Sequence, residues 1–241
     1  MIGRHLLKGH PDGSDPCMAH PVIVFDLDGT LIDTAPDLIA TLNFVLTKEG
    51  LPPVPYDQAR TLIGGGAKAM LARGLAAEKR DSSPAQLDKL FVDFINYYSE
   101  HIADRSRPFP GLEQTLDRLI DDGFKLAICT NKLEGLSRKL LETLRLTQRF
   151  AFICGQDTFG APKPNPDTLR KTVAAASGSM SDAFMIGDSE TDVLTARAAG
   201  VPVIGVDFGY TPRPIAEFRP DRVIGHFNEL PDAITSIRQN G

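Results

Sequence analysis

Short apolar runs alternate along the chain with longer stretches of helical periodicity, and the alternation begins at Val22. Nearly continuous apolar runs of this kind are typical of strands that are buried on both faces of a sheet. The runs cover residues 22–26, 125–130, 150–153, 183–188 and 201–206. Between them, Pro or Gly bounds helical stretches at residues 111–122, 133–145, 166–177 and 190–199. This rhythm predicts an α/β fold with a Rossmann-like core, in which helices cover a doubly wound parallel sheet.

One long stretch, from about residue 35 to residue 107, breaks the rhythm because it has helical patterns but no strong strand. The helical patterns occupy residues 37–49, 66–77 and 84–103. Proline marks both edges of the stretch, in Thr34-Ala35-Pro36 and in Arg107-Pro108-Phe109-Pro110-Gly111. Such stiff segments suit a two-strand hinge between two parts of a protein.

The expected domain organisation follows from this break. We expect an α-helical cap at residues 35–107, inserted into a core made of residues 21–34 and 108–241. Residues 1–20 lack periodicity and are expected to form a flexible N-terminal extension.

The composition argues against several classes of partner. The net charge is -5 and no block of five or six like charges occurs, so nucleic-acid binding is not expected. No apolar run reaches 18 residues, so no membrane span is expected either. The three cysteines form no CxxC pair and are too few for a disulfide framework, which predicts reduced thiols and a cytoplasmic protein. The five histidines lack metal-ligand spacing, and the sequence leaves monomer and homodimer open.

Two acidic residues, Asp26 and Asp28, stand at the end of the first predicted strand. Their spacing would point both side chains to the same side. Neighbouring carboxylates repel each other unless a cation or a proton lies between them, so the pair indicates a Mg²⁺ site. The alternative is a strand end that carries two solvated acids.

A second acidic cluster, at residues 187–192, ends another predicted strand. Oxygen-rich clusters of this kind suit hard cations, and Asp188 is the expected direct ligand. Asp192 would lie in the first turn of the next helix, where it could instead interact with the helix dipole or contact a metal ligand without binding the metal itself.

Three further residues indicate a phosphate site. Thr130 and Asn131 follow a third predicted strand and open a helix, so hydroxyl, amide and backbone N–H groups could meet a phosphate oxygen. The alternative for this pair is an ordinary helix cap. Lys163 lies between prolines in Ala161-Pro162-Lys163-Pro164-Asn165-Pro166, and this stiff backbone would aim its ammonium at an anion.

The acidic pair Asp26 and Asp28, the Thr130-Asn131 pair, Lys163 and the acidic cluster at residues 187–192, in this order along the chain, resemble the haloacid dehalogenase superfamily. The resemblance extends from Val22 to the C-terminus. It implies that Asp26 attacks phosphorus and that Asp28 protonates the leaving group and then activates water. It also implies that Thr130 and Lys163 bind phosphate, and that Asp26, the backbone carbonyl of Asp28 and Asp188 hold Mg²⁺. The implied fold is a Rossmann-like core with an α-helical cap.

Within the superfamily, the chain is most similar to the phosphoglycolate phosphatases. The similarity lies in residues 62–71, 107–111 and 205–210. In the first of these segments, Gly65 could let a substrate approach the backbone, and Lys68 could pair with a substrate carboxylate. The alternatives are a tight turn between helices for the glycines and a solvated helix position for Lys68.

The expected function is therefore Mg²⁺-dependent hydrolysis of a small phosphorylated metabolite, 2-phosphoglycolate above all, through an aspartyl-phosphate intermediate. Two other functions stay open: a phosphosugar mutase with the same motifs, and a non-catalytic module that accepts a phosphoryl group or binds a partner. A predicted cap favours a sequestered small substrate.

Overall fold

The structure, a computed structural model, describes residues 20–240. The extension predicted for residues 1–20 lies outside the described residues apart from His20, at which the first strand begins. None of the helices between residues 20 and 240 is both long and apolar enough to cross a membrane.

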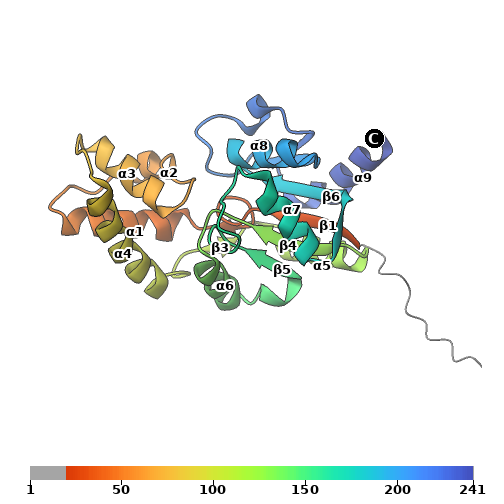
Figure 1. The fold of residues 1–241 in the computed structure, drawn as a ribbon, viewed down its shortest axis with the longest axis horizontal. Helices are drawn as coiled ribbons and strands as arrows, with labels where there is room; N and C mark the ends of the chain where they lie inside the picture. The colour runs from red at the N-terminus through yellow and green to blue at the C-terminus, as the bar shows by residue number, and fades with distance from the viewer. Residues whose placement is uncertain (1–19, 241) are drawn as a thin grey trace, which may run out of the picture.

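The core is a parallel sheet, as the sequence predicts, and it has six strands (Figure 1). Its strands are β1 (His20–Phe25), β4 (Lys125–Cys129), β5 (Phe152–Cys154), β6 (Gly178–Gly187), β7 (Val203–Val206) and β8 (Arg222–Ile224). They lie in the order β5-β4-β1-β6-β7-β8. The chain therefore starts in the middle of the sheet, builds one side with β4 and β5, and then crosses to the other side with β6. The predicted α/β fold is confirmed, although β8 was not predicted because it is short and two of its residues are exposed.

Helices cover both faces of this sheet: α5 (Leu112–Asp121), α6 (Glu134–Thr143), α7 (Pro166–Ala175), α8 (Glu190–Ala199) and α9 (Leu230–Asn240). Short 3-10 helices follow α6, β7 and β8: η1 (Thr147–Arg149), η2 (Ile215–Phe218) and η3 (Phe227–Glu229). Side chains alternate across β1, so Ile23 and Phe25 join the buried cluster that contains residues of α5, α6 and α9. Val22 and Val24 join the cluster on the opposite face, with residues of α7 and α8. Burial on both faces explains the continuous apolar pattern of the strands.

Four helices lie between β2 (Ile32–Asp33) and β3 (Arg107–Pro108), and we call them the helical insertion. They are α1 (Ala35–Lys48), α2 (Tyr56–Arg60), α3 (Ala67–Ala77) and α4 (Pro84–Glu100). The insertion projects from one end of the core, on the left of Figure 1. β2 and β3 pair antiparallel, so the chain leaves the core and returns to it through adjacent strands.

A buried carboxylate ties the two passages together. Asp37, in the first turn of α1, accepts hydrogen bonds from the backbone N–H groups of Arg105 and Ser106 and from the Ser106 hydroxyl, the last at 2.6 Å. The return segment is thereby fixed to the start of α1. This bond network therefore joins the first and last segments of the helical insertion next to the paired strands β2 and β3.

Candidate active site

The candidate site lies at the carboxyl ends of three neighbouring strands, β1, β4 and β6. Asp26, Thr130 and Asp188 each follow directly after the last residue of one of these strands. This position is the point where the chain reverses its direction of sheet building, and ligands of open α/β sheets bind at such points. A cavity of about 420 Å³ opens here, and residues of the core and of the helical insertion line it. That volume suits a small ligand.

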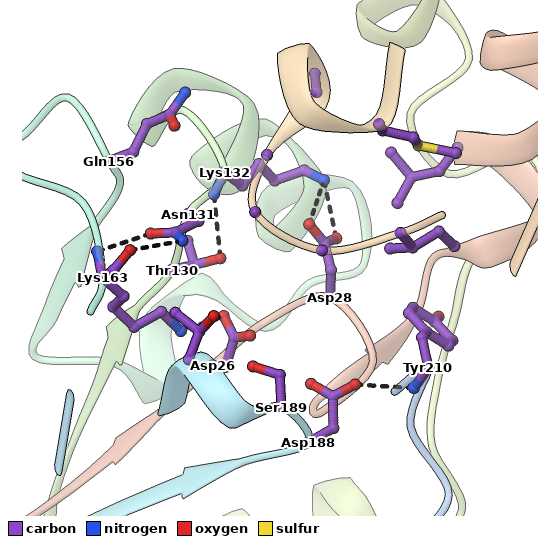
Figure 2. A pocket seen from close by; sticks show the side chains of 18 of the residues that line it. Asp26, Asp28, Thr130, Asn131, Lys132, Gln156, Lys163, Asp188, Ser189 and Tyr210 are labelled. Carbon is purple, nitrogen blue, oxygen red and sulfur yellow. Dashed lines mark hydrogen bonds and ion pairs between the residues drawn. The ribbon is translucent and has the colours of Figure 1, made fainter. Parts of the chain in front are cut away.

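Asp26 presents a buried carboxylate oxygen beside the Lys163 ammonium in this site (Figure 2). Its Oδ1 atom is buried, and within residues 20–240 its one partner is Nζ of Lys163, 3.0 Å away. Burial raises the pKa of Asp26 to about 6, and the Lys163 ammonium opposes this shift. A buried oxygen with a free lone pair beside a cation can act as a nucleophile toward an anionic substrate.

Lys163 is held in place at both its backbone and its ammonium. Nζ lies 2.6 Å from Oδ1 of Asp192, and the side chain is 2% exposed. Burial alone would lower the pKa of Lys163, but the carboxylates of Asp192 and Asp26 outweigh burial and hold it above the usual value. The Asn131 side chain accepts a hydrogen bond from the backbone N–H of Lys163 at 2.9 Å and donates one to its carbonyl at 3.1 Å. Asn131 thus positions Lys163 with the amide that the sequence assigned to phosphate.

Thr130 lies beside Asn131 and is 2% exposed. Its hydroxyl accepts a hydrogen bond from the backbone N–H of Lys132 at 3.3 Å, so the hydroxyl hydrogen can be donated to a ligand. Its backbone N–H donates to the carbonyl of Cys154 at 3.0 Å, which fixes the residue at the end of β4.

Asp188 is held by hydrogen bonds to both of its oxygens. Oδ1 accepts from the Thr30 hydroxyl at 3.2 Å, and Oδ2 accepts from the backbone N–H of Tyr210 at 2.8 Å. Burial, with the negative charges of Asp192 and Asp26, raises the pKa of Asp188 to about 8. The backbone of Gly29 passes so close that a Cβ there would lie 2.5 Å from Oδ2 of Asp188, which explains the glycine.

The donor set fits a hard divalent cation. Oxygens of Asp26, Asp188 and Asp192 lie within 4.8 Å of one another. Asp192 is already occupied, because Oδ1 meets Lys163 and Oδ2 accepts from the backbone N–H and the hydroxyl of Ser189 in a capping box. Asp26 and Asp188 would supply the carboxylate ligands, because their oxygens face the cavity and, in the described part of the chain, only the Lys163 ammonium is paired with Oδ1 of Asp26. A cation there would also relieve the repulsion that raises the pKa of Asp188.

The Asp28 side chain faces away from this cluster, toward the helical insertion (Figure 2). Its Oδ1 accepts from the Thr34 hydroxyl at 2.8 Å, and Nζ of Lys132 lies 2.9 Å from Oδ1 and 3.0 Å from Oδ2. The metal role implied for Asp28 concerns its backbone carbonyl, so this side chain stays available for acid–base chemistry.

Lys132 was not predicted as a site residue. Its side chain is 5% exposed, and its ammonium lies 4.5 Å from the ring centroid of Tyr98 in α4. The one signal in the sequence was its place directly after Thr130 and Asn131, but a lysine before a helix is ordinarily solvated. The contact with Asp28 spans 104 positions and joins the segments that follow the neighbouring strands β4 and β1.

The loop before α3 reaches the cavity from the insertion. Gly64, Gly65 and Gly66 line the cavity and have positive φ angles of 112°, 67° and 88°. Gly65 therefore lies where the sequence predicts. Arg73 holds this loop, because its guanidinium donates to the carbonyls of Leu62, at 2.7 Å, and Gly64.

The structure does not bring Lys68 to the cavity. Its ammonium is paired with Asp88 at 2.5 Å, and its side chain is 53% exposed. The residue lies in the first turn of α3, after the glycine loop, where the helix turns it away from the cavity lining. Its predicted contact with a substrate carboxylate has no support in this geometry.

The arrangement can carry out nucleophilic substitution on an anionic group. Asp26 faces the cavity, and negative charge there can be offset by Lys163 and by a cation held between the carboxylates of Asp26 and Asp188. Sequence comparison identifies the class. The family model for haloacid dehalogenase-like hydrolases matches residues 23–206. The chain belongs to this family, and it is a hydrolase, so the resemblance drawn from the motifs is confirmed.

Within the family, the chain is similar to proteins named phosphoglycolate phosphatase. It is 48% identical to one from Mesorhizobium japonicum over 88% of this chain and 94% of that protein. It is 45% identical to one from Agrobacterium fabrum over 89% of this chain and 92% of that protein. A crystal structure described as a predicted phosphoglycolate phosphatase from Haemophilus somnus superposes with a TM-score of 0.82 at 28% identity, covering 88% of this chain and 97% of that one.

Proposed function

We propose that this protein is a Mg²⁺-dependent phosphatase that hydrolyses 2-phosphoglycolate through an aspartyl-phosphate intermediate. The observation that carries the proposal is the buried Oδ1 of Asp26, paired with the Lys163 ammonium at 3.0 Å, in a cavity lined also by Asp188 and Thr130. The names of relatives that are nearly half identical over most of their length support the substrate.

In the first step, a carboxylate oxygen of Asp26 attacks phosphorus and the bond from phosphorus to the ester oxygen breaks. The Lys163 ammonium and the Thr130 hydroxyl stabilise the phosphoryl oxygens, and Asp28 gives its proton to the leaving alcohol. In the second step, Asp28 takes a proton from water, which attacks phosphorus and releases phosphate and the Asp26 carboxylate. Asp26, Asp188 and the backbone carbonyl of Asp28 would hold Mg²⁺, which when bound would offset the negative charges of the Asp26 carboxylate and the phosphate.

We propose further that residues 35–107 act as a cap over the core of residues 21–34 and 108–241. Support comes from the cavity, which the glycine loop of the insertion and the strand ends of the core line together. A Cβ at Gly66 would lie 3.2 Å from the carbonyl oxygen of Asn131, so the two parts approach each other closely. Such a cover excludes water and favours a compact substrate over a bulky one.

Phosphate release from a panel of esters tests the proposal. The panel contains 2-phosphoglycolate, phosphosugars, pyridoxal phosphate and nucleoside monophosphates, each with Mg²⁺ and with excess chelator. We expect the highest kcat/KM for 2-phosphoglycolate and no turnover without metal. Interconversion of phosphosugars with little phosphate release would favour a mutase, and the absence of turnover on any ester would favour a non-catalytic module.

A further inference from the structure

The cavity is lined by four basic side chains among the described residues, and they have different partners: Arg73, Lys132, Lys163 and Arg213. Lys163 faces Asp26 and Asp192. Arg73 donates to backbone carbonyls of the glycine loop, and Arg213 is 59% exposed and paired with Glu217. Lys132 differs, because it is buried and its partner is the proposed acid–base residue Asp28.

The chemistry of 2-phosphoglycolate puts its carboxylate close to Lys132. One methylene carbon separates the ester oxygen from the carboxylate carbon. Asp28 must reach the ester oxygen to protonate it, and Nζ of Lys132 lies 2.9 Å from Oδ1 of Asp28. A cation this close to the acid is therefore also close to any carboxylate attached one carbon beyond the ester oxygen.

The bonds around Asp28 allow Lys132 to exchange its bond to Asp28 for one to a substrate carboxylate. Oδ1 keeps a second partner, the Thr34 hydroxyl at 2.8 Å. Oδ2 is bonded, within residues 20–240, by Lys132 at 3.0 Å. A substrate carboxylate that takes this donor from Oδ2 leaves Asp28 anchored through Thr34, with Oδ2 free to face the ester oxygen.

A second donor lies beside Lys132. The Tyr98 hydroxyl is buried and has no hydrogen-bond partner in the described part of the chain, and Tyr98 also lines the cavity. Burial raises the pKa of Tyr98 to about 12, although the Lys132 ammonium opposes the shift, so the hydroxyl keeps its proton at neutral pH. A buried hydroxyl without a partner costs free energy that a ligand could recover.

We infer that Lys132, with the Tyr98 hydroxyl beside it, binds the carboxylate of the substrate and so selects phosphate esters of short 2-hydroxycarboxylic acids. The inference rests on the proposed phosphatase function. It assigns carboxylate recognition to Lys132 in place of Lys68, which the sequence suggested and which the structure pairs with Asp88 outside the cavity.

The test compares the kcat/KM values of two esters of equal length: 2-phosphoglycolate, and 2-hydroxyethyl phosphate, in which an uncharged hydroxymethyl group replaces the carboxylate. The ratio of the two values separates recognition of the carboxylate from every effect that the esters share. In Lys132→Met we expect the ratio to fall at least about tenfold, because the variant loses a hydrogen bond between charged groups. Lys132→Arg should retain most of the preference, and Tyr98→Phe should lower the ratio about threefold or more. Lys125→Met, at the exposed opposite end of β4, is the matched control and should leave the ratio unchanged.

Equal losses on both esters in Lys132→Met would overturn the inference, because Lys132 would then act only by orienting Asp28. A wild-type enzyme that hydrolyses both esters equally well would also overturn it, while the phosphatase mechanism would stand. Failure to release phosphate from either ester would instead refute the proposed function. If Lys132→Met does not fold, Lys132→Gln keeps a polar group beside Asp28 and must show the same fall in the ratio.

Discussion

Replacing Asp192 with Asn tests the reasoning about the buried charges beneath the site. Asp192 is fully buried, and its two oxygens serve different partners: Oδ1 meets the Lys163 ammonium at 2.6 Å, and Oδ2 accepts from Ser189. An Asn side chain keeps one acceptor but turns an NH₂ group toward a donor at the other position. The Asp192→Asn variant therefore loses either the bond to Lys163 or the cap of α8.

The expected loss of stability follows from these contacts. Removing one partner of a buried ion pair costs about 3–5 kcal/mol. Lys163 keeps Asp26 at 3.0 Å, so we place the loss at the lower end, about 3 kcal/mol. For a chain of this length that corresponds to a fall in Tm of about 6–12 °C.

Urea unfolding at neutral pH, in excess chelator, measures this loss directly. The matched control is Asp182→Asn, which removes an ion pair of similar length, 2.7 Å to Arg238, between side chains that are each 41% exposed. Because exposed pairs contribute about 0–1 kcal/mol, the control should unfold almost like wild type. If Asp192→Asn is as stable as the control, Asp192 does not hold Lys163 by charge, and the account of the buried cluster is wrong.

Three further predictions concern the site. Asp26→Ala should lower kcat about a thousandfold or more, because no aspartyl phosphate can form, and activity within tenfold of wild type would exclude Asp26 as the nucleophile. Burial raises the pKa of Asp26 to about 6 and that of Asp188 to about 8, so without metal their contribution to stability is present at acid pH and is lost as pH rises through these values. Mg²⁺ needs the ionised carboxylates, so the increase in Tm that Mg²⁺ causes should grow between pH 6 and pH 8, and a constant increase would contradict the proposed ligands. Gly29→Ala places a Cβ 2.5 Å from Asp188 and should abolish most activity, whereas Gly50→Ala, at a similar φ of +74° with no atom within 4 Å, should cost about 1–2 kcal/mol of stability and little activity.

The sequence determined the sheet and the residues that end its strands. Strands buried on both faces need continuous apolar runs, and this requirement is local, so β1, β4 and β6 could be found from the pattern of apolar residues alone. Their carboxyl ends meet at one edge of a parallel sheet, which is why Asp26, Thr130 and Asp188 could be placed together before any coordinates. The edges of elements were less certain: Phe150 fits an apolar run but lies before β5, where it packs against Phe25 with ring centroids 6.5 Å apart.

Tertiary structure alone decided where the side chains between these strand ends point. Asn131 looked like a phosphate donor, yet its amide is used by the backbone of Lys163, 32 positions away. Lys68 and Lys132 are both lysines next to predicted helices, but the packing of α3 and α4 brings the first to Asp88, and the pairing of β1 and β4 brings the second to Asp28. A periodic pattern records which face of an element is buried, because burial repeats with the period of the helix or strand. It does not record which distant charge a flexible side chain meets, because that depends on how segments far apart in the sequence pack together.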